Sequence, residues 1–148
     1  MLQIDPIELA NYFQRPGGTD WVDFMDNVLW AACWQAGIPE SAVVTCLRTD
    51  IPDGGVDAQV SLGSGRDVTG YLKEPSIWQF KATREANLKP GELVAEVNKP
   101  YARERILAGD AYRLCLCAQL PPDRRAELET ALEALLRPST FPHLTPKC

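Results

Sequence analysis

The sequence contains Asp-Gly-Gly-Val-Asp at residues 53–57 and Ser-Ile-Trp-Gln-Phe-Lys-Ala at residues 76–82. The glycine pair predicts a tight turn, and Asp57 stands where a strand begins after it. The second segment predicts a strand in which Gln79 and Lys81 share one face, because side chains alternate along a strand. If the two strands pair as a hairpin, we expect Asp57, Gln79 and Lys81 to converge at one end of a sheet.

Alternation also assigns the apolar side chains of these strands to faces. In the strand predicted over residues 56–62, the side chains of Val56, Ala58 and Val60 share one face. In the strand predicted over residues 76–82, Trp78 and Phe80 point away from the face of Gln79 and Lys81.

Helices and two further strands are predicted around this pair. A helix begins at Thr19 and ends at Gly37, with apolar residues at i, i+3, i+4 and i+7. The other predicted elements are a strand over 42–48, helices over 90–98 and 100–108, an apolar strand over 111–120 and a helix from 121–123 onward. The strand over 111–120 is expected deep in a covered sheet. This order predicts an α/β sandwich around a mixed sheet.

The 148 residues suit one domain. We expect an N-terminal extension over residues 1–18, a folded domain over 19–137 and a proline-rich tail or linker over 138–148. A linker at that end would join the domain to further parts of a longer protein.

Charge is unevenly distributed along the chain, whose formal net charge is −5. Residues 1–72 hold three basic and ten acidic side chains, whereas residues 73–113 hold eight basic and six acidic ones. The middle third therefore fits two interpretations, a phosphate-binding face or an ordinary solvated helix surface. The candidate phosphate contacts are Arg84, Lys89, Arg103 and Arg105.

The five cysteines and the single histidine, His143, limit the chemistry. An odd cysteine count, no signal-peptide pattern and no long apolar run predict a cytoplasmic protein with reduced thiols and no membrane span. Cys115 and Cys117 are expected to share a face of their strand as small packing residues. One histidine excludes most zinc sites and any triad that needs a second histidine.

The convergence of Asp57, Gln79 and Lys81 favours metal-dependent chemistry. Carboxylate and amide oxygens are hard ligands that suit Mg²⁺ or Mn²⁺. A lysine beside such an ion can position or deprotonate a water molecule and stabilise a charged transition state. Asp26 lies on the apolar first helix and is a candidate for one more oxygen ligand, since burying an unpaired carboxylate is costly.

These residues resemble the motif of the PD-(D/E)xK nuclease superfamily and, within it, the Mrr-like restriction endonuclease group. That group has Gly-Gly-Val-Asp or a close relative at a strand start, followed by a strand that carries Gln-x-Lys. The resemblance covers residues 19–136 and implies that Asp57 binds a metal ion, that Gln79 is the variant second ligand and that Lys81 is the catalytic lysine.

The resemblance also implies an acidic residue on the first helix. Asp26 stands eleven residues before Gly37 and matches that position better than Asp23. Two features depart from the family pattern: aspartate replaces the usual glutamate on this helix, and the long gap before Gln79 requires residues 63–75 to loop out.

The function that the resemblance implies is that of a Mg²⁺- or Mn²⁺-dependent endonuclease that cuts double-stranded DNA and leaves a 5′-phosphate and a 3′-hydroxyl. Its implied fold is a restriction-endonuclease-like α/β/α sandwich. The backbone carbonyl of Phe80 is a further candidate ligand, since it lies between two site residues. Mrr-like domains often lie beside recognition or NTPase modules in bacterial restriction and antiphage systems. The resemblance therefore implies the effector part of a larger defence protein, active as a homo-oligomer when assembly clusters its nuclease domains.

Two alternatives belong to other functional classes. In the first, the nuclease fold is retained without catalysis and serves as a DNA-binding or oligomerisation module. In the second, the chain is an α/β protein–protein interaction domain with one polar strand face.

Overall fold

The structure, a computed structural model, describes residues 6–13, 19–46, 54–65 and 70–136. The predicted tail, with His143, lies outside the described residues. The elements in chain order are α1 (Pro6–Phe13), α2 (Thr19–Gln35), the 3-10 turn η1 (Glu40–Ala42), β1 (Val43–Thr45), β2 (Ala58–Val60), β3 (Ser76–Ala82), the 3-10 turn η2 (Glu85–Asn87), α3 (Pro90–Val97), α4 (Pro100–Leu107), β4 (Ala111–Cys117) and α5 (Pro122–Leu135).

The strands form one mixed sheet in the order β1-β2-β3-β4. β2 is antiparallel to both β1 and β3, whereas β3 and β4 are parallel. A parallel pair needs a long crossover, which α3 and α4 provide. The prediction of an α/β fold with a mixed sheet is confirmed.

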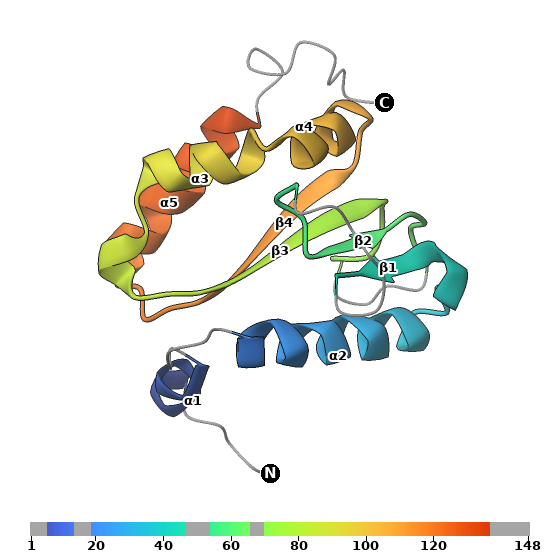
Figure 1. The fold of residues 1–148 in the computed structure, drawn as a ribbon, viewed down its shortest axis with the longest axis horizontal. Helices are drawn as coiled ribbons and strands as arrows, with labels where there is room; N and C mark the ends of the chain where they lie inside the picture. The colour runs from blue at the N-terminus through green and yellow to red at the C-terminus, as the bar shows by residue number, and fades with distance from the viewer. Residues whose placement is uncertain (1–5, 14–18, 47–53, 66–69, 137–148) are drawn as a thin grey trace.

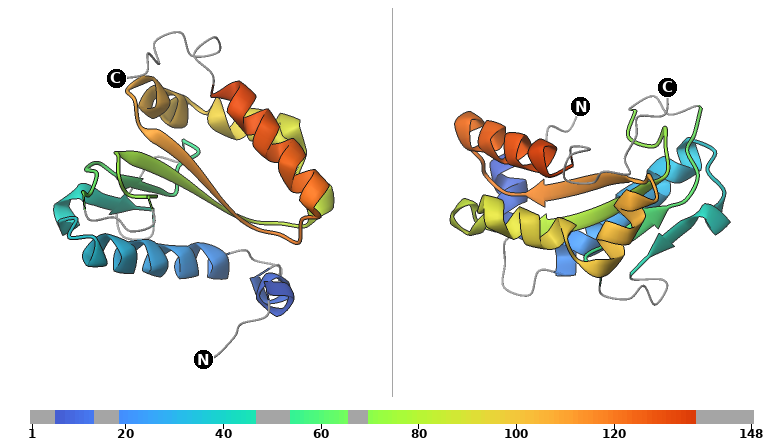
Figure 2. Two further views of the ribbon diagram at one scale, coloured as in Figure 1. Left: turned by 180° about the vertical axis from the view of Figure 1, so that it is seen from behind. Right: turned by 90° about the horizontal axis from the view of Figure 1, so that it is seen from above.

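Helices cover both faces of this sheet (Figure 1). On one face, Trp78 and Phe80 of β3 pack in a core cluster with Leu29 of α2. On the other face, Ile77 packs with Val97 of α3 and Ile106 of α4. α5 lies on this second face as well, where it packs against α3 (Figure 2). The predicted alternation along residues 76–82 is therefore confirmed, and Gln79 and Lys81 belong to the face covered by α3 and α4.

The helix predicted from Thr19 is α2, and it ends as the sequence indicates. Gly37 has φ 74°, a left-handed conformation that glycine adopts without a steric penalty. The N–H of Gly37 donates to the carbonyl of Trp34, and the N–H of Ile38 donates to that of Cys33 at 2.9 Å. This pair of hydrogen bonds is a Schellman motif, which satisfies carbonyls at the helix end.

Residues 1–18, the predicted extension, include a helix that the sequence analysis did not identify. Phe13 of α1 packs against Trp21 at the start of α2, with ring centroids 5.2 Å apart. Its side chain belongs to the same core cluster as the inner face of α2. α1 therefore adds an aromatic contact at the start of α2.

Two predictions about the strands are wrong. Val56 does not share the face of Ala58 and Val60, because the chain bends at Asp57 and Val56 packs in the cluster on the other face. The strand predicted over 111–120 was expected deep in the sheet, but it ends at Cys117 and lies at one end of the strand order within the described chain. Five of its seven residues are only partly buried. An apolar run is typical of a central strand, but it also suits an edge strand with helices on both faces.

The face shared by Cys115 and Cys117 is confirmed, since both pack against the cluster that contains α2. Neither thiol, nor that of Cys33 or Cys46, forms a disulfide. None of the helices in the described part of the chain combines the length and the apolar character needed to cross a bilayer.

Candidate active site

Asp57 lies at the bend before β2 and is bonded to β3. Its backbone N–H donates to the carbonyl of Trp78 at 2.8 Å, and its Oδ2 accepts a hydrogen bond from the N–H of Phe80 at 2.6 Å. These two bonds join Asp57 to the residues on either side of Gln79. The convergence of the Asp57, Gln79 and Lys81 side chains on one metal ion stays a prediction.

The glycine pair before Asp57 allows a close approach to the junction of α3 and α4. Gly55 has φ 85°, and a Cβ built there would lie 2.5 Å from Cδ of Lys99. A Cβ on Gly54 would collide with Cβ of Tyr101. The carbonyl of Gly54 accepts a hydrogen bond from the N–H of Ala102 at 3.2 Å. The glycines thus serve packing as well as the turn, and this packing positions the bend at Asp57 before β2.

Gln79 and Lys81 extend from the face of β3 that α3 covers. The Oε1 atom of Gln79 is buried and has no hydrogen-bond partner among the described residues. The Nζ of Lys81 lies 3.7 Å from Oε2 of Glu92 and 3.9 Å from Oε1 of Glu96, one helical turn apart on α3. The ammonium group therefore lies near two carboxylates of α3. Lys81 directly follows Phe80, the residue of β3 that is hydrogen-bonded to the Asp57 side chain.

Glu96 and Tyr112 belong to this site although the sequence analysis missed both. Glu96 Oε2 forms a 2.6 Å ion pair with Lys99, whose side chain lies against Gly55. Burial raises the pKa of the Tyr112 hydroxyl, and the carboxylates of Glu96 and Asp57 raise it further. Both carboxylates therefore lie within electrostatic reach of this hydroxyl.

The sequence carries a partial signal for these two residues. Glu92 and Glu96 are spaced i, i+4 and so form an acidic strip on one side of α3. Their approach to Lys81 depends on where α3 packs, which the sequence does not state. Tyr112 lies in an apolar run and has no local signal at all.

Asp26 lies on a different element and on the other face of the sheet. It belongs to α2, the helix that packs against Trp78 and Phe80, and is 3% exposed. The pKa of the Cys46 thiol is raised first by burial and then by the carboxylates of Asp57 and Asp26. Both carboxylates therefore act on Cys46, yet the structure does not bring Asp26 to the face of Gln79 and Lys81. Its role as a metal ligand stays a prediction.

The four basic residues predicted to contact phosphate differ in their surroundings. Arg84 and Lys89 are exposed. Arg103 is exposed too, and its Nη1 donates to Asn98 at 3.4 Å. Arg105 instead binds the buried carboxylate of Asp110 through Nε and Nη2, both at 2.8 Å. This pair closes the turn between α4 and β4 and gives Arg105 a structural role, while DNA contact stays a prediction for all four.

The donor set around Asp57 fits a hard divalent cation. Asp57 offers a carboxylate, and Gln79 offers a buried amide oxygen that accepts no hydrogen bond from the part of the chain that the structure describes. A buried polar atom left without a partner normally marks a place for a water molecule or an ion. Within residues 6–13, 19–46, 54–65 and 70–136, no group of three or more His, Cys, Asp and Glu side chains is placed to hold a metal ion. Any site here therefore needs the amide oxygen.

Comparison of the chain with protein-family models, with curated proteins and with solved structures gave no match.

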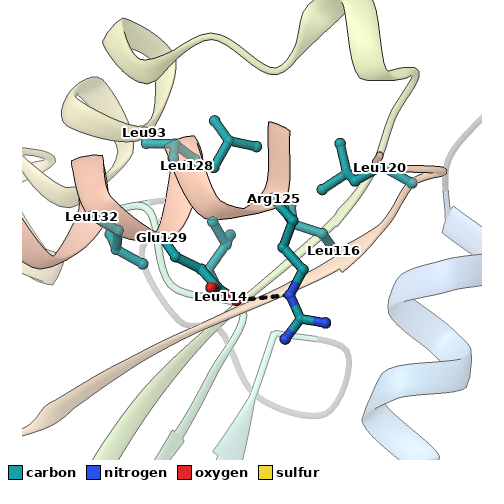
Figure 3. Close-up of a pocket in the computed structure, with 9 residues that line it drawn as sticks. Leu93, Leu114, Leu116, Leu120, Arg125, Leu128, Glu129 and Leu132 are labelled. Carbon is teal, nitrogen blue, oxygen red and sulfur yellow. Dashed lines mark hydrogen bonds and ion pairs between the residues drawn. The ribbon is translucent and has the colours of Figure 1, made fainter. Parts of the chain in front are cut away.

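A hollow of about 430 Å³ with a mainly apolar lining lies between β4, α3 and α5 (Figure 3). Its charged lining residues, Arg125 and Glu129, bind each other at 2.8 Å. The rest of its lining is mainly leucine: Leu93, Leu114, Leu116, Leu120, Leu128 and Leu132. This hollow is an apolar surface beside the edge strand and shares no lining residue with the site at Asp57.

Proposed function

We propose that this chain is a Mg²⁺-dependent DNA endonuclease domain of the PD-(D/E)xK type, with a restriction-endonuclease-like α/β/α sandwich. The observation that carries the proposal is the hydrogen bond from the Phe80 N–H to Asp57, which holds a carboxylate beside Gln79 and near Lys81 on one strand. The motif residues, far apart in the sequence, are thus neighbours in space.

Each residue has a role that its chemistry supports. Asp57 and Gln79 would hold Mg²⁺ or Mn²⁺ through oxygen atoms, with the Phe80 carbonyl as a further donor. The bound ion would polarise the phosphate and make a water ligand more acidic. Lys81 would orient the attacking water and offset the charge that develops on the phosphate. Glu92 and Glu96 restrict the ammonium group of Lys81 from the side of α3.

The order of elements also supports this proposal. A helix, three strands, two helices, a strand and a helix follow one another from α2 to α5, the order expected from the resemblance. Residues 61–65 and 70–75, the described part of the segment between β2 and β3, lie outside any strand, which accommodates the long gap before Gln79.

The proposed substrate is double-stranded DNA, and the proposed setting is a larger bacterial defence protein. Three exposed cations follow β3 in the sequence: Arg84, Lys89 and Arg103. They are few, and the chain is acidic overall. A low affinity for the phosphate backbone suits a domain that cuts DNA efficiently only when several copies are clustered.

Product ends test the reaction type. Duplex DNA cut by the chain should be rejoined by DNA ligase without prior kinase or phosphatase treatment, because hydrolysis at this type of site leaves a 5′-phosphate and a 3′-hydroxyl. Products that ligase rejoins only after such treatment would contradict the proposed reaction.

A second candidate, an interaction module without catalysis, is favoured by the surface around β4. This strand is partly exposed, with the leucine-lined hollow on one face and an apolar groove of about 580 Å³ toward α2 on the other. DNA binding or self-association by a folded chain that never cleaves would support this candidate over the nuclease.

A further inference from the structure

The edge of β4 that faces away from β3 presents a regular row of backbone groups (Figure 2). Within the part of the chain that the structure describes, β4 pairs with β3 alone, over all seven of its residues and without a bulge. The N–H of Ala111 donates to β3 side residue Pro75, and the carbonyl of Cys117 accepts from Thr83, so the odd-numbered residues of β4 bond toward β3. The N–H and C=O groups of the even-numbered residues therefore point outward: Tyr112, Leu114 and Leu116.

This edge lacks the features that commonly keep an edge strand from pairing. Proteins protect such edges with prolines, bulges and charged side chains. β4 contains neither a proline nor a bulge, and its one charged residue, Arg113, forms an ion pair with Glu74 at 3.2 Å. A regular apolar edge of this kind is a template to which another strand can be added.

Apolar surface flanks the edge on both faces of the sheet. On the α5 face lies the leucine-lined hollow, whose lining includes Leu114 and Leu116. On the α2 face lies the groove of about 580 Å³, whose lining includes the exposed side chains of Val28 and Tyr71. A strand that paired with β4 would therefore bring apolar area out of water beside it, and this burial drives most protein association.

A second copy of this chain fits the edge because the edge is self-complementary. In an antiparallel pair, directly opposed residues exchange two hydrogen bonds at every second position. With Leu114 opposite the partner's Leu114, Tyr112 lies opposite the partner's Leu116, and every outward-pointing residue of β4 is bonded. Opposed residues lie on one face of a sheet, so the α5 face of one copy continues into the α5 face of the other.

The charges beside the leucine-lined hollow favour the same arrangement. A two-fold axis through the sheet sets α5 antiparallel to the same helix of the second copy. α5 exposes Arg125 and Glu129, one turn apart, at the rim of the hollow (Figure 3). On two antiparallel helices, this spacing brings Arg125 toward the partner's Glu129 and Glu129 toward the partner's Arg125. Each copy thus offers the charge that the other needs.

We propose that the outer edge of β4 binds a second copy of this chain, so that two antiparallel β4 strands join the two sheets about a two-fold axis at Leu114. The inference concerns an interface and does not depend on catalysis. It names a surface through which the proposed nuclease domains can cluster.

The first test is sedimentation of the full chain over a range of concentrations, in which the wild type should pass from monomer to dimer. Arg125→Glu and Glu129→Arg should each weaken the dimer about tenfold, because each sets like charges against each other across the axis. An equimolar mixture of the two variants should dimerise about as strongly as the wild type, since their charges are then complementary. A defect within one helix would not be rescued by mixing. Glu40→Arg, an equivalent charge reversal beside β1 at the opposite edge, is the matched control and should dimerise as the wild type does.

The second test measures the register. Arg113 would lie opposite the partner's Cys115 in a non-hydrogen-bonded pair, where the Cα atoms are about 4.5 Å apart, within the range of a disulfide. Arg113→Cys should therefore give a covalent dimer under mild oxidation, with the new thiol joined to Cys115, whereas Arg113→Ser should give none. A wild type that stays monomeric at about 1 mM, a mixture that dimerises no better than its components, or a folded Arg113→Cys variant without this cross-link overturns the inference. Each of these outcomes leaves the nuclease proposal to its own test.

Discussion

The carboxylate of Asp57 accepts a 2.6 Å hydrogen bond from the backbone N–H of Phe80, and this contact joins the start of β2 to the middle of β3. A side chain here takes the place of a ladder carbonyl, because the chain bends at Asp57 before the strand begins. The same contact fixes Asp57 at the residue that follows Gln79 on β3. Local structure and proposed chemistry thus depend on one carboxylate.

Substitutions at Asp57 should separate its charge from its hydrogen bond. Asp57→Asn keeps an oxygen that can accept from Phe80, so its unfolding free energy should stay close to that of the wild type while cleavage is lost. Asp57→Ala leaves a part-buried N–H without its partner and should cost about 1–3 kcal/mol. Urea denaturation measures both, and equal stabilities of the two variants would contradict the role of this hydrogen bond.

Gly54 should tolerate alanine poorly. The added Cβ would meet Cβ of Tyr101, which cannot move without shifting α4, so Gly54→Ala should lose about 1–3 kcal/mol of stability by overpacking. Gly91→Ala, in the first turn of α3, is the matched control because nothing lies within 4 Å of its added Cβ. It should be neutral or stabilising by up to about 1 kcal/mol. Thermal unfolding that ranks the two variants in the opposite order would contradict the close packing.

Arg105 should matter for stability more than for DNA. Arg105→Ala leaves the Asp110 carboxylate, whose side chain is 5% exposed, without its partner, which should cost about 3 kcal/mol. Arg103→Ala, on the exposed side of the same helix, should unfold at nearly the wild-type urea concentration. If Arg105→Ala is as stable as Arg103→Ala and binds DNA more weakly, the residue is a phosphate contact instead.

Much of the fold can be predicted from local patterns, and the errors occur where packing decides. The stop at Gly37 and the alternation along residues 76–82 are short-range features, and the structure confirms both. The face of Val56 was predicted wrongly because alternation holds only inside a strand, and the bend at Asp57 precedes β2. The position of β4 at an edge depends on sheet order, which an apolar run does not encode.

The candidate site follows the same division. Asp57, Gln79 and Lys81 were identified from their motif, which consists of two short stretches of sequence. Glu96 and Tyr112 come from elements that meet the motif only after the β3–β4 crossover has folded. Burial of Asp26 was expected from its apolar helix, but the helix packs on the other face.

Tyr112 should make the protein sensitive to alkaline pH. Burial and the carboxylates of Glu96 and Asp57 raise the pKa of its hydroxyl in the folded state, whereas an unfolded tyrosine ionises near pH 10. The folded protein then holds a proton that the unfolded chain has released, so stability is retained below about pH 10 and falls as the pH rises above it. Unfolding free energy measured against pH should fall less steeply in Tyr112→Phe, by up to about 1.4 kcal/mol per pH unit.

Tyr71→Phe is the matched control for that experiment, because it removes the hydroxyl of an exposed tyrosine. Equal slopes above pH 10 for the wild type and Tyr112→Phe would show that this hydroxyl ionises as readily in the folded protein as in the unfolded chain.

The most direct test of the proposed nuclease is cleavage of supercoiled plasmid by the chain alone and by the chain fused to a dimerising coiled coil, in Mg²⁺ and in EDTA. The account predicts nicked or linear DNA in Mg²⁺, most of all for the clustered form, and none in EDTA. Asp57→Asn and Lys81→Ala should lose about a hundredfold or more of this activity. Lys73→Ala, which removes an exposed lysine before β3, should retain it. Folded protein that cuts in neither form, or a Lys81→Ala variant that cuts as the wild type does, would contradict the account.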